Sequence, residues 1–172
     1  MKGLFRLSFI LFLFSSNLKT SEYEITILAT NIANFGGVGE WSFSALLENE
    51  KESILFDTGF DEDTVLHNAQ LLGKDLSRVE KVILSHFHGD HTGGLLKLRK
   101  TYMNINSKAF SQVYVADGFF EQRYDKDGNL RGFIGGFDDV NEFIKETDAM
   151  GINFKIIKEP HEISENLILS GP

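Results

Sequence analysis

The sequence contains no cysteine among its 172 residues. This absence excludes disulfide bonds, thiolate zinc ligands, a catalytic cysteine and a lipid-modified cysteine near the N-terminus. A metal ion bound by this chain must therefore use imidazole nitrogen or oxygen ligands. If the protein is exported, its stability must come from its hydrophobic core, because no disulfide can contribute.

Positive charge is also scarce. Lysine and arginine number 17 against 25 aspartates and glutamates, which gives a formal net charge of −8. This balance argues against nucleic acid as a partner bound through a basic surface. Separately, we expect the substrate to be a small molecule. A hydrophobic content of 42% and a charged content of 24% are typical of a folded globular chain. A chain of 172 residues suffices for one domain with a proper core and is too short for two ordinary ones.

The sequence has no apolar run long enough to span a bilayer as a helix. Residues 7–14 are apolar except for Ser8; they follow Lys2 and Arg6 and precede a polar stretch that reaches Thr20. This layout is typical of a secretory signal peptide, so we predict a signal over residues 1–20, a domain over residues 21–172, and a periplasmic or secreted location. The alternatives are an uncleaved interfacial anchor, which would be the only membrane contact, or a buried N-terminal segment.

The most informative stretch follows an apolar segment, residues 81–84, that is typical of a buried strand. Four side chains of metal-ligand type lie within residues 86–91: His86, His88, Asp90 and His91. Only five histidines occur in the whole chain, so this density is hard to reconcile with surface histidines on a polar loop.

The spacing of these residues also suits metal binding. In extended backbone His86 and His88 point the same way, because side-chain direction repeats every two residues. Gly89 lets the chain turn sharply, so that Asp90 and His91 face a neighbouring point. We therefore predict that this one loop supplies ligands to one or two divalent ions. Zinc is the expected ion, and iron or manganese are alternatives.

Residues 86–91, His-Phe-His-Gly-Asp-His, followed by Thr-Gly-Gly at 92–94, resemble the signature of the metallo-β-lactamase-fold hydrolases. The upstream Ile-Leu-Phe-Asp-Thr-Gly at 54–59 is similar to the strand and loop that precede that signature. Residues 68–76, 117–124 and 169–172 further resemble one branch of this superfamily. That branch is named after a dihydropterin-methyl-ribofuranosylaminobenzene-phosphate synthase. The resemblance extends from about Tyr23 to the last residue.

The resemblance implies an α/β fold, the αββα metallo-β-lactamase sandwich. It assigns His86 and His88 to a first metal and Asp90 and His91 to a second, with Asp90 also a catalytic residue. It further implies a metal-dependent hydrolase in which a bridging hydroxide attacks an ester, lactone, amide or phosphodiester. Asp57 would lie beneath the metal loop as an outer hydrogen-bond acceptor; the alternative is a turn-capping aspartate.

The family draws its remaining metal ligands from the second half of its domain, whereas this sequence ends at Gly171 and Pro172. We therefore expect the N-terminal half of the sandwich: a fragment, the product of a disrupted gene, or half of a site that a homodimer or a complementing chain completes. The alternative function is a non-catalytic metal-binding or interaction remnant. His67 and His161 match no ligand position and are predicted to lie at the surface.

A different class of enzyme is suggested by Asp57-Thr58-Gly59 after an apolar strand. Aspartic proteases present their catalytic carboxylates in this way, and a single copy would require a homodimer. This hypothesis leaves the histidine cluster unexplained.

The remaining pattern predicts alternating strands and helices, which favours a layered α/β domain. The expected strands are 24–30, 41–48, 53–56, 81–84, 112–116, 152–157 and 166–169, with 41–48 and 53–56 forming a hairpin. The expected helices are 61–72 capped by Asp61, one from a Thr92 cap through Leu98, and 138–150 capped by Asp138 or Asp139. A turn is expected at residues 125–128.

Overall fold

The computed structural model describes residues 22–131, 137 and 139–171. The predicted signal peptide, residues 1–20, lies outside these described residues and stays a prediction. Among the helices of the described part, none is long and apolar enough to cross a membrane.

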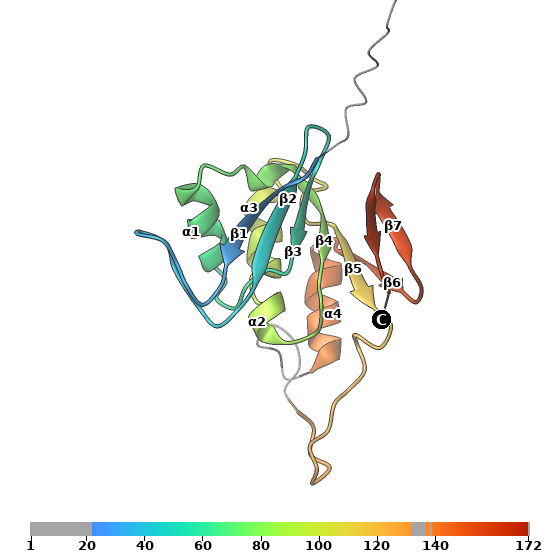
Figure 1. The fold of residues 1–172 in the computed structure, drawn as a ribbon. Coiled ribbons are helices and arrows are strands. Elements are labelled where there is room, and N and C mark those ends of the chain that lie inside the picture. The colour runs from blue at the N-terminus through green and yellow to red at the C-terminus, as the bar shows by residue number, and fades with distance from the viewer. Residues whose placement is uncertain (1–21, 132–136, 138, 172) are drawn as a thin grey trace, which may run out of the picture.

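A six-stranded mixed sheet forms the centre of the molecule, in the order β1-β2-β3-β4-β5-β6 (Figure 1). β1 to β3 are antiparallel, which confirms the predicted hairpin of β2 and β3, and β3 to β6 are parallel. The strands are β1 (Glu24–Ala29), β2 (Ser44–Glu48), β3 (Ser53–Phe56), β4 (Val79–Ile83), β5 (Gln112–Ala116) and β6 (Asn153–Ile157). The central strands are apolar on both faces because both faces are covered, as in β5, where Val113, Tyr114 and Val115 are all buried.

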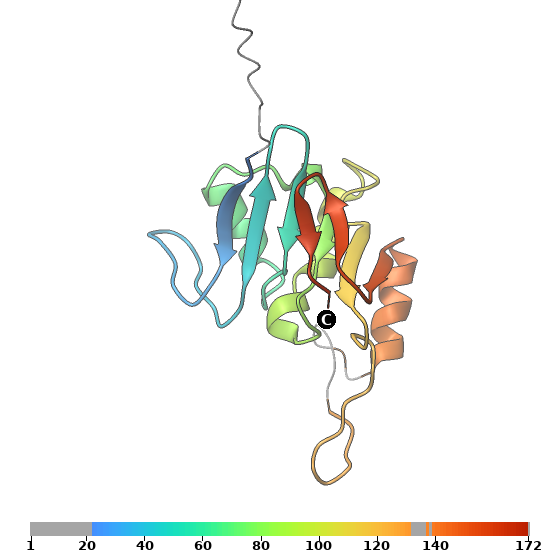
Figure 2. The same ribbon diagram turned by 45° about the vertical axis from the view of Figure 1, so that its right-hand side comes forward.

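Three helices cover one face of the sheet (Figures 1 and 2). They are α1 (Thr64–Leu71), α3 (Leu95–Tyr102) and α4 (Val140–Ala149), and they alternate with the parallel strands along the chain. Their apolar stripes, represented by Val65, Leu98 and Phe143, pack on strand residues such as Leu55 and Val82 to form the main core.

The opposite face carries a two-stranded hairpin, β7 (His161–Ser164) and β8 (Leu167–Leu169), seen in front of the sheet in Figure 2. Ile163 of this hairpin packs against Ile54, Ile83 and Ile157 in a second, smaller core. Helices, central sheet and hairpin therefore form three layers, and the predicted α/β class is confirmed.

Several predicted boundaries were wrong for local reasons. Asp61 does not cap α1, because its carboxylate accepts the Asp63 N–H at 3.0 Å in a turn before the helix starts. Thr92 lies inside the short helix α2 (Gly89–Thr92), and α3 begins only after Gly94. The cap of α4 is confirmed as Asp139, which accepts the Asn141 N–H at 2.8 Å. β7 was not predicted.

The parallel strands determine where a site forms. β3, β4 and β5 all end at the same edge of the sheet, and polar segments follow each of them. Asp57 follows β3, the histidine-rich segment follows β4, and a charged loop follows β5. Ligand sites in such sheets lie outside the carboxyl ends of the strands.

Candidate metal centre

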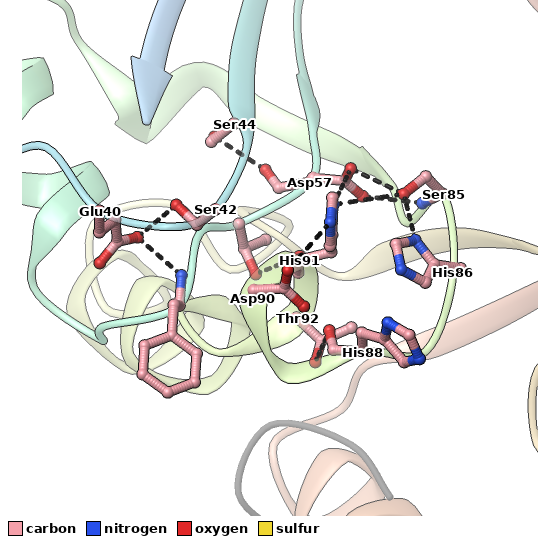
Figure 3. A network of polar contacts seen from close by, with 12 residues as sticks. Glu40, Ser42, Ser44, Asp57, Ser85, His86, His88, Asp90, His91 and Thr92 are labelled. Atoms are coloured by element: carbon pink, nitrogen blue, oxygen red, sulfur yellow. Dashed lines mark hydrogen bonds and ion pairs between the residues drawn. The ribbon is translucent and has the colours of Figure 1, made fainter. Parts of the chain in front are cut away.

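The metal loop, residues 85–94, leaves the end of β4 and turns through α2 before entering α3. Figure 3 shows its histidines and Asp90 close to Asp57, which comes from the end of β3. Two loops that are distant in sequence therefore build the site, each held by a buried strand.

Asp57 adopts a left-handed backbone conformation, with φ of 55°, which is uncommon outside glycine. The surrounding bonds hold it there. Its N–H donates to the Ile83 carbonyl at 2.8 Å, and its carbonyl accepts the Ser44 hydroxyl at 2.8 Å. The Thr58 N–H then donates to the His91 carbonyl at 2.7 Å. This conformation aims the Asp57 carboxylate at the metal loop, and an unusual backbone held in this way often marks a functional site.

Two glycines of the metal loop allow it to lie against the loop after β3. A Cβ on Gly93 would come within 2.0 Å of the Phe60 carbonyl oxygen, and one on Gly94 within 2.3 Å of the Thr58 carbonyl oxygen. The Thr-Gly-Gly that follows the histidine motif is thus explained by close packing of two backbones.

The Asp57 carboxylate is 1% exposed and fully engaged (Figure 3). Oδ1 accepts the Ser85 N–H at 2.7 Å, and Oδ2 accepts the Ser85 hydroxyl at 2.8 Å. Oδ2 also lies 2.7 Å from His91 Nδ1, so that nitrogen carries the proton and Nε2 is left as the ligand atom. Burial raises the pKa of Asp57, and the bonds from Ser85 and His91 oppose this rise.

Three of the four predicted ligands converge on one point. Ligand atoms of His86, Asp90 and His91 all lie within 4.8 Å of one another. His91 Nε2 is 3.5 Å from Asp90 Oδ2, close to the spacing of about 3.4 Å expected for two ligands of one tetrahedral zinc ion. Two imidazoles and a carboxylate form a donor set that suits zinc, so these residues fit the metal ion that the resemblance implies.

His88 lies next to these three residues but does not belong to the group whose ligand atoms lie within 4.8 Å of one another. Its ring centroid is 4.5 Å from that of His86, and it lies at the N-cap of α2 with extended backbone angles. The predicted division of the four residues between two metals stays a prediction; among the described residues, His86, Asp90 and His91 form one group of potential ligands.

His86 is held in a state that can bind a metal. Its Nδ1 lies 3.0 Å from the Ser85 hydroxyl. Burial lowers the pKa of His86, and the neighbouring His91 and His88 lower it further. A neutral imidazole is the form that coordinates metal ions.

The other two histidines lie elsewhere, as predicted. His67 is exposed on α1, and its Nε2 is 2.8 Å from the Gly36 carbonyl oxygen. His161 is exposed at the start of β7, near the ring of Tyr114. Neither belongs to the metal-ligand group found among the described residues.

The aspartic-protease hypothesis is wrong. A protease aspartate must reach substrate and share a proton with a second aspartate. Asp57 is instead buried and bonded to Ser85 and His91. Gly59 adopts φ of 77° to pack against Glu40 and Val65, which explains the Asp-Thr-Gly sequence structurally.

A cleft of about 850 Å³ opens over the metal loop. His88, Gly89 and Asp90 form one part of its lining. The rest comes from side chains that the sequence analysis did not assign to a site: Trp41, Phe60, Phe87, Arg123, Tyr124 and Arg131. The alternation of residues 41–48 predicted Trp41 as part of a strand, but β2 begins only at Ser44, which leaves Trp41 free to line the cleft.

A profile of the metallo-beta-lactamase superfamily matches residues 41–161. The chain belongs to this superfamily. An uncharacterised protein of Methanocaldococcus jannaschii is 32% identical over 147 residues, which cover 86% of this chain and 52% of that protein. The 7,8-dihydropterin-6-methyl-4-(beta-D-ribofuranosyl)-aminobenzene-5'-phosphate synthase of the same organism is 35% identical over 88 residues, covering 48% of this chain and 30% of the synthase.

Among solved structures, a metal-dependent hydrolase of the beta-lactamase superfamily is similar with a TM-score of 0.62 and 30% identity. The match covers 88% of this chain and 48% of that structure. The resemblance to the superfamily and its fold is confirmed by these comparisons. The chain spans about half the length of the first of these relatives and of this structure.

Proposed function

We propose that this protein is a metal-dependent hydrolase that acts on a small-molecule ester, lactone, amide or phosphodiester. The observation that carries the proposal is the convergence of ligand atoms of His86, Asp90 and His91 within 4.8 Å, with Asp90 and the neighbouring His88 lining an open cleft. The solved metal-dependent hydrolase supports it, because that protein is 30% identical over most of this chain.

In this proposal, His86, Asp90 and His91 hold a divalent ion, with His88 as a further ligand beside His86. Zinc suits this donor set best, and iron or manganese are alternatives. When bound, the ion would supply an electrophile and lower the pKa of a water molecule to near neutrality.

The protein's own groups orient the reaction. Asp57 keeps the proton of His91 on Nδ1, so that Nε2 points toward Asp90. The side chain of Asp90 is 23% exposed and lines the cleft, so its carboxylate can accept a proton during attack on the substrate.

The test is hydrolysis by the full chain of matched chromogenic substrates: an aryl ester, an aryl lactone, an anilide and an aryl phosphodiester. We expect turnover with added zinc or manganese and loss of turnover with a chelator. Asp90→Asn should lower kcat by at least about a hundredfold, whereas His67→Ala should leave it unchanged. Turnover that survives both the chelator and Asp90→Asn would refute the proposal.

A non-catalytic metal-binding role is the second candidate, and a specific observation favours it. The described residues gather three ligands and one neighbouring histidine, and the chain spans about half of its longer relatives. Metal binding without turnover on any of the four substrates would support this role, or a site completed by a second copy or a complementing chain.

A further inference from the structure

The cleft contains positive charge that the metal centre does not explain. Arg123 and Arg131 both line it, in a chain whose formal net charge is −8. We propose that the cleft binds a small molecule that carries an anionic group, phosphate or carboxylate, next to a planar ring, and that Arg131 binds the anion. This inference rests on the proposed hydrolytic function, because it concerns the substrate of the same site.

The two arginines are brought together by the arginine loop, residues 117–131, which follows β5 and projects beyond the sheet (Figure 1). Tyr124 and Leu130 form an antiparallel bridge, and the Arg131 N–H donates to the Arg123 carbonyl at 2.9 Å. Arg123 and Arg131 therefore lie opposite each other on the two arms of a hairpin.

The turn of this hairpin is organised by Asp125. Its Oδ1 accepts the Asp127 and Asn129 N–H groups, both at 2.9 Å, and its Oδ2 accepts the Asn129 side-chain amide at 3.0 Å. Gly128 adopts φ of 83°, which the turn requires. The hydrogen bonds of the turn thus fix the register of the two arms, and this register determines the positions of Arg123 and Arg131.

The two guanidinium groups have different roles. The guanidinium group of Arg123 is already bound by protein groups. Its Nη1 donates to the Glu121 carbonyl at 2.6 Å, and its Nη2 donates to the Gly118 carbonyl at 3.0 Å. The group also lies 4.8 Å from the centroid of the Phe87 ring. Arg131 is exposed and its charge acts on Asp125 in the turn, but within the described residues no hydrogen bond or ion pair within 4.0 Å holds its guanidinium group. Its planar donor fork is therefore free to bind an oxyanion in a bidentate manner.

The remaining wall of the cleft suits a planar ring. Trp41, Phe60 and Tyr124 are 78%, 62% and 59% exposed, although aromatic side chains of this size usually bury most of their surface. Their grouping around a concave site with polar groups at its base favours a small molecule over a protein partner. An aromatic wall beside a free arginine matches a ligand that combines a ring with an anion.

The test uses Trp41, which is the only tryptophan of the chain, as a fluorescent reporter of binding. The full chain is stripped of metal with a chelator, so that the probe cannot bind through an ion. Phenylphosphonate, benzoate and benzyl alcohol are titrated as a phosphate-like anion, a carboxylate and a neutral analogue of similar size. Arg131→Gln is compared with Arg78→Gln, an exposed arginine that lines a separate pocket.

We expect at least one of the two anions to bind about tenfold more tightly than benzyl alcohol, and Arg131→Gln to remove that advantage. Arg78→Gln should bind like the wild type, and added salt should weaken binding of the anion. Tight binding of phenylphosphonate alone would identify a phosphate, and of benzoate alone a carboxylate. Equal affinity for benzyl alcohol and both anions, no fluorescence response, or an unchanged Arg131→Gln would overturn the inference.

This outcome is separable from the proposed function, because no metal takes part in the titration. A chain that fails to hydrolyse any substrate can still show the preference for anions. Conversely, an active hydrolase without that preference would retain the proposed function and refute the inference.

Discussion

The two walls of the cleft are built differently. The metal loop is bonded to other parts of the chain: Thr58 donates to its His91 carbonyl, Phe43 donates to its Asp90 carbonyl, and buried Asp57 accepts from Ser85 and His91. The outer part of the arginine loop, residues 121–131, is bonded mainly within the loop, through the Tyr124–Leu130 bridge and the Asp125 turn. The metal loop is therefore anchored to the core, whereas the arginine loop is anchored at its start, by buried Phe119 and the Asp117 N–H that donates to the Ile157 carbonyl, and projects beyond it.

The two walls have different tasks: one holds the metal ligands, and the other binds the outer part of the substrate. Metal ligands must be held to within a fraction of an ångström, which requires buried, over-determined support. Groups that bind the outer part of a substrate tolerate more freedom, and loops that project from a rigid scaffold commonly supply them. Changes beneath the metal loop should therefore affect both folding and metal binding, whereas changes in the arginine loop should affect ligand binding alone.

The largest effect is expected from Asp57→Ala. Removal of the carboxylate leaves the Ser85 N–H and His91 Nδ1–H without their buried partner, so the free energy of unfolding should fall by about 2–4 kcal/mol. Metal affinity should fall by about 10–100-fold, because the His91 ring loses its orientation. Denaturant unfolding and a competitive metal titration measure the two effects.

The matched control for Asp57 is Asp127→Ala, which removes an exposed aspartate from the arginine loop. It should change neither unfolding nor metal affinity. Equal effects of the two substitutions would remove the distinction between the walls.

A smaller loss of stability is expected from Gly94→Ala. Its backbone, with φ of −79°, suits alanine, but the Cβ would lie 2.3 Å from the Thr58 carbonyl oxygen. The two loops must move apart, at a cost of about 1–3 kcal/mol, and metal affinity should fall with stability.

Gly73→Ala is the comparison, because it has a left-handed φ of 67° but open space around it. It should cost about 1 kcal/mol through backbone strain and leave metal affinity unchanged. If Gly94→Ala binds metal as well as Gly73→Ala does, close packing of the loops is not required for the site.

Glu40→Gln should have a still smaller effect, which depends on pH. Glu40 accepts hydrogen bonds from Ser42, Thr64 and the backbone of Phe60, as Figure 3 shows in part for Ser42. Burial acts to raise the pKa of Glu40, but the hydrogen bonds from Ser42, Phe60, Asp61 and Thr64 together lower it. The carboxylate form is therefore the one that stabilises the fold.

Because the pKa of Glu40 is lower in the folded state, its contribution is fully present above its ordinary pKa and is lost as pH falls through the lowered value. Above that range Glu40→Gln should reduce the free energy of unfolding by about 1 kcal/mol. The difference from wild type should shrink in acid. Unfolding measured across pH tests this, and a difference that grows in acid would contradict the stated role of the carboxylate.

The smallest effect is expected from Asp125→Ala in the arginine loop. The substitution removes the acceptor that organises the turn, so Arg131 loses its fixed position opposite Arg123. Binding of phenylphosphonate should weaken by about threefold, while metal affinity stays unchanged. Lost metal affinity in this variant would show that the two walls are coupled.

The same contrast explains what the sequence predicted. The buried strands and the histidine motif carry strong local patterns, so the sheet, the β2–β3 hairpin and the histidine-rich loop after β4 were all predicted. The Asp139 cap and the turn near residue 125 were predicted for the same reason, since their side chains bond to backbone only two residues away.

The features that were missed depend on contacts between distant segments. Thr92 was predicted to cap α3, but contact of Gly93 and Gly94 with Phe60 and Thr58 places a separate turn there. The arginine side of the cleft could not be predicted, because Trp41, Arg123 and Arg131 meet only in the folded chain.

The central claim, that His86, Asp90 and His91 form one metal site, is tested most directly by zinc binding to the full chain. Equilibrium dialysis with elemental analysis should be compared for wild type, His91→Ala and His67→Ala. We predict that His91→Ala loses the bound zinc that wild type and His67→Ala retain. Equal zinc retention by all three proteins, or no zinc bound by wild type, would contradict it.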